Sequence, residues 1–215
     1  ARASRAQEFV PFLQPLVDAR TQQVRGAEVL MRWRHPSVGM INPDLFIPQA
    51  EASGLIMPMT EQLMQKVASA LIWGQLPCGG WNYVFNFAGE NSLKQWYATI
   101  GKNAWRLEEF QHYYGNATFD DSGTMQAAKF LLRMYVEKDD PVYRYPLEKV
   151  IHFVLQSQYP SGGWPQRFPL MHDHPFRGKK DYSSFITLND DVTPENIEFL
   201  IQCYQAIGLQ NVKEP

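Results

Sequence analysis

The sequence has few cysteines, no excess of either charge and no long hydrophobic run. Its two cysteines, Cys78 and Cys203, are far apart, which excludes a disulfide-framed scaffold and leaves no Cys-x-x-Cys metal site. The 20 Lys and Arg residues against 22 Asp and Glu residues give a net charge of -2, so electrostatics favours neither a nucleic acid polymer nor an anionic membrane surface. No apolar segment reaches the roughly 18 residues that span a bilayer. We therefore expect no nucleic acid and no membrane partner.

The chain nevertheless has the composition of a folded globular protein. Of its 215 residues, 45% are hydrophobic and 20% are charged, which separates it from disordered sequences. Aromatic residues make up 13%, and spare planar side chains are one common feature of carbohydrate-binding clefts. The composition is thus compatible with a carbohydrate ligand.

Hydrophobic periodicity divides the chain near residues 73–80, where Gly and Pro interrupt a helical pattern. Before this point, alternating segments predict strands and are followed by helical spacing, whereas helical spacing dominates after it. The expected strands cover residues 9–18 and 24–33, and the expected helices cover 46–54, 59–72, 93–112, 124–137, 146–158 and 194–207. The sequence therefore predicts a β/α unit over 1–76 and a mainly helical domain over 77–215.

Four segments of the first domain carry a family resemblance. They read FLQPLVD (12–18), GAEVLMRWRHP (26–36), FIPQAE (46–51) and GLI (54–56). In this order and spacing they resemble the start of EAL-type cyclic di-GMP phosphodiesterases over about residues 8–72. The resemblance implies a partial barrel, a divalent cation such as magnesium or manganese on Glu28, and substrate contacts from Gln14 and Arg32.

The remaining acidic motifs of that family do not follow Glu28. A single carboxylate cannot hold a catalytic pair of metal ions, so a fragment that only packs is the alternative to a phosphodiesterase. A partial barrel would also leave the edge of a parallel strand without partners, which favours self-association or packing on the second domain.

The second domain carries another set of motifs. They read WRLEEF (105–110), ATFDDSGT (117–124), QYPSGGWPQ (158–166) and ITLNDD (186–191). Together they resemble the pectate lyases of polysaccharide lyase family ten, over about residues 78–215. The fold class implied for the whole chain is mainly α, an incomplete α/α toroid of antiparallel helix pairs behind a small N-terminal β/α unit.

That resemblance also implies a chemistry. Pectate lyases cleave polygalacturonate by β-elimination, in which calcium neutralises the uronate carboxylate and an arginine removes the proton. Arg167 and Arg177 are the nearest candidates for the base by loop position, and Arg167 is the expected one, although neither matches the family motif, which lies beyond the Asn-Asp-Asp run. The remaining expected site residues are Asp120, Asn189, Asp190 and Asp191 as calcium ligands, and Trp164 and Lys179 as substrate contacts.

Each of these assignments has a structural alternative. Asp120 and Asp191 each precede a predicted helix, where an aspartate commonly caps the helix N-terminus. Trp164 is equally compatible with a place in the core.

Three functions therefore stay open. The first is a calcium-dependent pectate lyase acting on polygalacturonate or a related acidic polysaccharide, inactive if the downstream arginine region is needed. The others are a cyclic di-GMP phosphodiesterase fragment and a non-catalytic carbohydrate- or nucleotide-binding chimera. A lyase would be secreted or periplasmic, and a phosphodiesterase would be cytoplasmic.

Overall fold

The structure is a computed structural model that describes residues 8–17, 19–20, 24–82, 94–101, 115–170 and 183–208. Its contacts divide the chain into two compact units, Ala1–Leu71 and Ile72–Pro215. No helix among the described residues is both long enough and apolar enough to cross a membrane.

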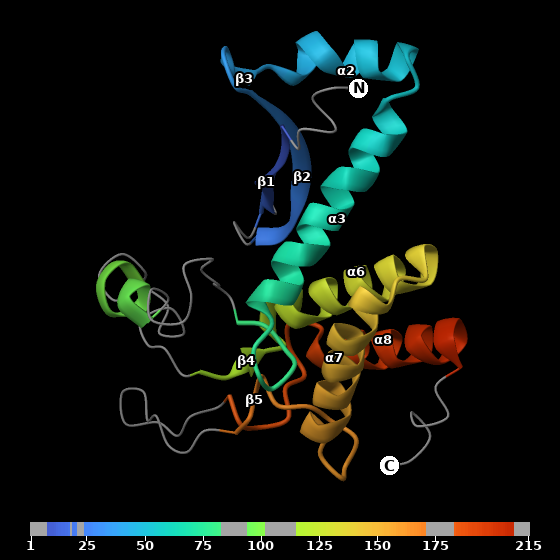
Figure 1. The fold of residues 1–215 in the computed structure, drawn as a ribbon. Coiled ribbons are helices and arrows are strands. Elements are labelled where there is room, and N and C mark those ends of the chain that lie inside the picture. Colours follow the sequence, from blue (N-terminus) through green and yellow to red (C-terminus); the bar gives the residue numbers. More distant parts are fainter. Residues whose placement is uncertain are drawn as a thin grey trace. The chain divides into compact units, whose positions relative to one another are not determined.

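The first unit is a three-stranded sheet packed against two helices (Figure 1). The strands are β1 (Phe9–Val17), β2 (Val24–His35) and β3 (Gly39–Ile41), and the helices are α2 (Pro43–Ala52) and α3 (Ile56–Gly74), whose last residues belong to the second unit. The order β1-β2-β3 is antiparallel throughout. The expectation of a parallel strand is therefore wrong, because β1 and β2 form a hairpin.

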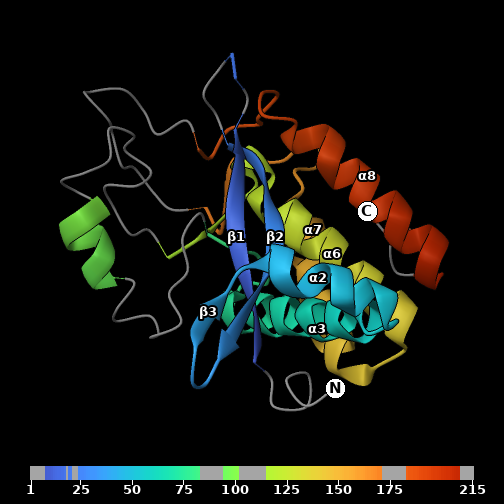
Figure 2. The same cartoon turned by 90° about the horizontal axis from the view of Figure 1, so that it is seen from above.

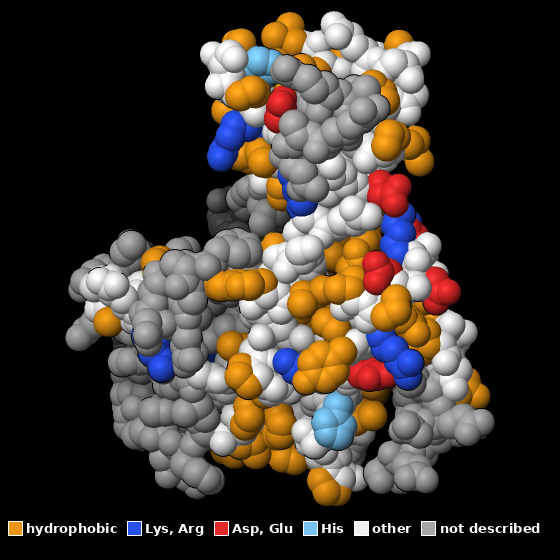
Figure 3. Space-filling model, viewed as in Figure 1, with side chains coloured by type: hydrophobic (Ala, Val, Ile, Leu, Met, Phe, Trp, Pro, Cys, Tyr) orange, Lys and Arg blue, Asp and Glu red, His pale blue; other side chains and the backbone are white. Residues whose placement is uncertain are grey.

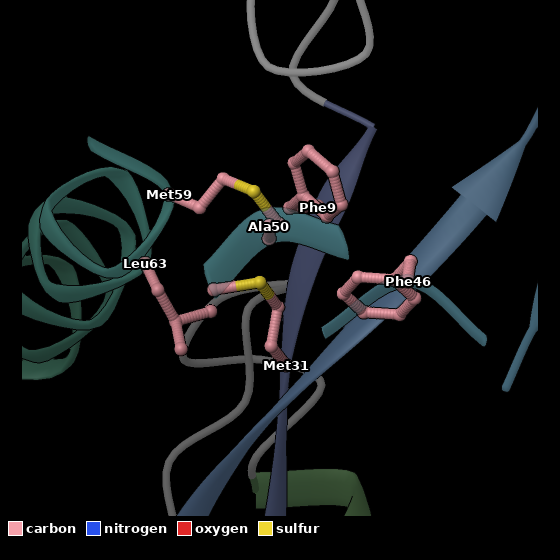
Figure 4. Packing of buried hydrophobic residues seen from close by; sticks show 6 residues of the cluster. All are labelled: Phe9, Met31, Phe46, Ala50, Met59 and Leu63. Atoms are coloured by element: carbon pink, nitrogen blue, oxygen red, sulfur yellow. The ribbon is translucent and has the colours of Figure 1, made fainter. Parts of the chain in front are cut away.

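One face of the hairpin forms the core of this unit. Phe9 and Met31 project from β1 and β2 onto the helices, and side chains of α2 and α3 pack against them (Figure 4). The buried cluster consists of Phe9, Met31, Phe46, Ala50, Met59 and Leu63. Because side chains alternate between the faces of a strand, the even-numbered positions of the paired segments lie on the opposite face.

The outer edge of β1 bears on self-association. Arg34 N donates to Glu8 O at 2.9 Å. The backbone N–H and C=O groups of the even-numbered residues of β1 therefore bond to β2, and those of the odd-numbered residues point away from β2, toward the outer edge. Pro11 and Pro15 are odd-numbered, and neither has an N–H to offer to another strand. This edge of the described sheet is thus a poor template for a second chain, which disfavours the expected self-association through the strand edge.

The second unit is mainly helical. Its longest elements are α6 (Gly123–Lys138), α7 (Arg144–Ser157) and α8 (Val192–Ile207), with two-residue strands β4 (Ala117–Thr118) and β5 (Arg167–Phe168) paired antiparallel. Short helical turns cover Tyr97–Gly101, Asp120–Ser122 and Pro141–Tyr143. The three helices predicted over 124–137, 146–158 and 194–207 are confirmed, while most of 93–112 lies outside the described residues.

Seen from above, α6 and α8 lie close to one another (Figure 2), and contacts between them give their relative direction. Ser122 contacts Glu195, and further along both helices Lys129 contacts Glu198. The residue numbers of the contacting pairs increase along both helices, so the two helices run in the same direction. The space-filling view presents the side of α6 and α7, where acidic, basic and hydrophobic side chains lie next to one another (Figure 3).

The buried thiol of Cys203 gives a first testable prediction. Burial raises its pKa to about 12, so almost no thiolate forms at pH 8, and the side chain is fully buried in α8. We expect Cys203 to resist a thiol reagent such as Ellman's reagent in the native protein and to react at once in 6 M guanidinium. Rapid labelling of Cys203 in the native state, located by peptide mass spectrometry, would contradict this packing.

Candidate metal and carbohydrate site

The second unit contains two copies of one turn. Residues 75–81 read QLPCGGW and residues 158–164 read QYPSGGW. The hydrogen bonds match as well, because Gln75 Nε2 donates to Gly79 O at 2.7 Å and Gln158 Nε2 donates to Gly162 O at 3.2 Å. The second residue of each turn also donates its backbone N–H to the carbonyl of the second Gly in the same turn. The turn is therefore a duplicated structural element.

Each turn supports a second duplicated segment. Trp81 O accepts from Thr118 N, and Trp164 O accepts from Thr187 N, both at 2.8 Å. The segments that begin there read TFDDSGT (118–124) and TLNDDVT (187–193). In each segment the hydroxyl of the last Thr donates to the carbonyl of the first Thr, at 2.6 Å in the first segment and 3.2 Å in the second. The two segments lead directly into α6 and α8.

Both segments adopt the same unusual backbone. Asp121 and Ser122 have φ of 51° and 60°, and Asp190 and Asp191 have φ of 52° and 54°. Consecutive left-handed residues other than glycine are uncommon and cost free energy. Their occurrence in both copies marks the two loops as places where the backbone is shaped to aim side chains.

These loops bring three carboxylates together. One oxygen each of Asp120, Asp121 and Asp190 lies within 4.8 Å of the others. Two oxygens that bind the same calcium ion at about 2.4 Å can be at most about 4.8 Å apart. Asp120 is buried, Asp190 is half-buried and Asp121 is exposed. The cluster therefore has the donor type and spacing for a hard cation, and it is open to solvent on the side of Asp121.

Asp120 is held in a fixed orientation. Its Oδ1 accepts from Asp121 N at 3.2 Å, and its Oδ2 accepts from Gln166 Nε2 at 2.8 Å. Gln166 is itself buried and follows the second copy of the turn, so it links Asp120 of the first copy to the second. Fixing both oxygens lowers the entropy that a ligand must lose when an ion binds.

The other two predicted calcium ligands lie beside this cluster. Asn189 donates from Nδ2 to Asp190 Oδ2, which orients that carboxylate. Asp191 is exposed and is not among the three clustered carboxylates. Helix capping does not account for Asp191, because its side chain makes no capping hydrogen bond at the N-terminus of α8. Asp120 is not the N-cap residue of α6, since Ser122 occupies that position.

Trp164 and Arg167, predicted as a substrate contact and as the base, are both buried. Trp164 is 1% exposed, and its indole N–H donates to Val154 O of α7 at 2.8 Å, so its ring belongs to the core rather than to a sugar platform. Arg167 is 4% exposed in β5, which argues against proton abstraction from a polymer in solvent. Lys179 and Arg177, the other candidate for the base, lie outside the described residues.

The residues predicted from the first domain share one face. Gln14 and Glu28 lie directly opposite one another in the β1–β2 pair. Arg32 lies four residues after Glu28 in β2, and therefore on the same face. Gln14 and Glu28 are exposed, and the Arg32 guanidinium carbon stands 5.9 Å from the Phe12 ring centroid. Among the described residues this face offers no second carboxylate near Glu28, so a magnesium or manganese site stays a prediction.

Sequence reasoning missed Asp121, which belongs to the cluster, and Gln166, which donates to Asp120. Asp121 stands beside a predicted ligand, but only its left-handed backbone reveals that it joins the cluster. The duplicated Gln-x-Pro-x-Gly-Gly-Trp turn was visible in the sequence, and aligning the copies would have paired Asp121 with Asp190.

Comparisons with known proteins agree with this division of the chain. Residues 1–75 match the EAL domain model, and residues 75–211 match the model described as pectic acid lyase. Among curated proteins of Escherichia coli K12, cyclic di-GMP phosphodiesterase PdeL is 54% identical over 65 residues, and the probable phosphodiesterase PdeG is 46% identical over 94 residues. These matches cover 30% and 43% of this chain but 18% of each relative. The chain thus spans less than a fifth of their length.

Among solved structures, the family 10 polysaccharide lyase of Cellvibrio cellulosa is 21% identical with a TM-score of 0.45, over 68% of this chain and 38% of that chain. A mutant of that lyase, solved in complex with trigalaturonic acid, matches with the same TM-score. The pectic acid lyase model covers more than half of the present chain. The chain therefore belongs to the pectic acid lyase family and carries an EAL domain fragment ahead of the lyase region.

Proposed function

We propose that the second unit binds calcium at Asp120, Asp121 and Asp190 and, through that ion, the uronate carboxylate of an acidic polysaccharide such as polygalacturonate. The observation that carries this proposal is the meeting of three carboxylate oxygens within 4.8 Å from two loops about 70 residues apart in sequence. Membership of the pectic acid lyase family supports the choice of substrate class.

The arrangement suits calcium for electrostatic reasons. Three carboxylates at this spacing repel one another, and a divalent cation removes that repulsion. Calcium accepts six to eight oxygen ligands, so three protein carboxylates leave positions for water and for a substrate carboxylate. Bound calcium would neutralise the uronate charge and so acidify the neighbouring C–H bond that β-elimination breaks.

The role of this chain's own residues is binding and orientation. Gln166 and the Asp121 N–H hold the Asp120 carboxylate, and Asn189 holds that of Asp190. The same proposal includes two further points. The second unit is part of a toroid of antiparallel helix pairs, and the boundary between the two domains lies between residues 76 and 77. Elimination needs a base in addition, and the buried position of Arg167 does not favour that residue.

Polysaccharide binding tests this function. In affinity electrophoresis, the full chain should be retarded by polygalacturonate with calcium and should migrate freely after chelation. Asp190→Asn should abolish the retardation, because it removes one of three charged ligands, while neutral methyl-esterified pectin should not retard the parent. Absorbance of the unsaturated product would report elimination in parallel, with cyclic di-GMP hydrolysis as the test of the first unit. Equal retardation with and without calcium would contradict the proposal.

A further inference from the structure

A comparison of the two copies separates structural residues from others. The Gln, Gly, Trp and Thr residues of the duplicated segments share a set of hydrogen bonds in the two copies, which assigns these bonds to the fold. Glu195 breaks the equivalence. Its counterpart in the first copy is Gln126, which is exposed, whereas Glu195 is half-buried and contacts the other copy.

The contact of Glu195 joins the two loops of the acidic cluster. Ser122 Oγ donates to Glu195 Oε1 at 2.8 Å. Ser122 follows Asp121 directly, and Glu195 lies in the first turn of α8, five residues after Asp190. The hydrogen bond therefore ties the loop of Asp121 to the helix that begins at the loop of Asp190.

Both partners give up more favourable local arrangements in this contact. Ser122 is the N-cap residue of α6, but its side chain makes no capping hydrogen bond, so the helix lacks the stabilisation that such a bond gives. Glu195 Oε2 is buried without a hydrogen-bond partner among the described residues, which costs desolvation free energy. A contact formed at this cost is poorly explained by stability alone.

We propose that Glu195 is a positioning residue for calcium, which acts through Ser122 to hold Asp121 at the correct distance from Asp190. The proposal rests on the calcium site of the proposed function. Without the contact, the loop of Asp121 would no longer be tied to α8, and the Asp121 carboxylate would be free to move away from Asp190. Calcium would then meet two fixed carboxylates instead of three.

The chain offers a matched control further along the same pair of helices. Lys129 Nζ and Glu198 Oε2 are 2.5 Å apart and also join α6 to α8, but neither residue adjoins the loops. Replacing Glu198 therefore weakens the packing of the two helices without affecting the position of Asp121.

Isothermal titration of the full chain with calcium tests the proposal. Ser122→Ala and Glu195→Ala should each weaken calcium binding about tenfold, and the double variant should bind no more weakly than either single variant. Glu195→Gln keeps an acceptor oxygen for Ser122 and should bind within about twofold of the parent, as should Glu198→Ala.

Three results would overturn the inference. They are parent-like affinity in Ser122→Ala, an equal loss in Glu198→Ala, and a loss in Glu195→Gln as large as in Glu195→Ala, which would indicate a general charge effect. If Glu195→Ala does not fold, Ser122→Ala still decides, because its residue is only partly buried. A parent that takes up no calcium would overturn the proposed function and this inference together.

Discussion

Calcium should raise the stability of this chain by about 2.7 kcal/mol at a hundredfold excess over its dissociation constant. For a unit of this size, that corresponds to a rise in melting temperature of about 5–10 °C. The physical reason is that Asp120, Asp121 and Asp190 are held together only in the folded state, so the ion binds the folded state preferentially. Differential scanning fluorimetry with calcium and after chelation measures the shift.

The adjacent aspartates provide the control. Asp190→Asn and Asp191→Asn each remove one negative charge from residues with almost equal φ, 52° and 54°, and asparagine tolerates that conformation. Only Asp190 belongs to the cluster. Asp190→Asn should therefore abolish the calcium-dependent shift, and Asp191→Asn should keep most of it. Equal behaviour of the two variants would show that calcium acts on the general negative charge.

The duplicated glycines should differ sharply when each is replaced by alanine. Gly79 and Gly162 occupy the same position in the two turns and have φ of 107° and 93°, so both variants incur backbone strain of about 1–2 kcal/mol. An added Cβ at Gly79 would lie 2.4 Å from Lys149 O, in the backbone of α7, while at Gly162 it would meet no atom within 4 Å. Gly79→Ala should therefore cost at least about 3 kcal/mol in total.

Urea unfolding of both variants measures this difference. The midpoint should fall moderately for Gly162→Ala and much further for Gly79→Ala, with little change in the slope of the unfolding free energy against urea. Similar losses in the two variants would mean that α7 does not pack against the first turn as described.

The helices of the second unit were predictable because their burial is periodic. Leu147, Val150, Ile151 and Val154 recur at helical spacing in the sequence, and all four are buried in α7. Strand direction was not deduced from alternation, which is the same in parallel and antiparallel sheets. The short link between Val17 and Val24 was nevertheless informative, because a parallel crossover needs about a dozen residues.

The candidate site was only partly predictable. Asp120 and Asp190 were identified by their motifs, and the structure brings them together. The part played by Asp121 depends on a left-handed φ, which no propensity assigns to an aspartate before a helix. The contact between Ser122 and Glu195 spans 73 positions of sequence, and only the packing of α6 on α8 reveals it. Trp164 could not be assigned to core or surface from composition alone.

The most direct test of the central claim is a crystal structure of the full chain grown with calcium, examined for anomalous scattering. We expect one calcium peak among Asp120, Asp121 and Asp190, about 2.3–2.6 Å from an oxygen of each carboxylate. No peak at this position, with the three carboxylates turned apart in the presence of saturating calcium, would contradict the assignment of these loops as a calcium site.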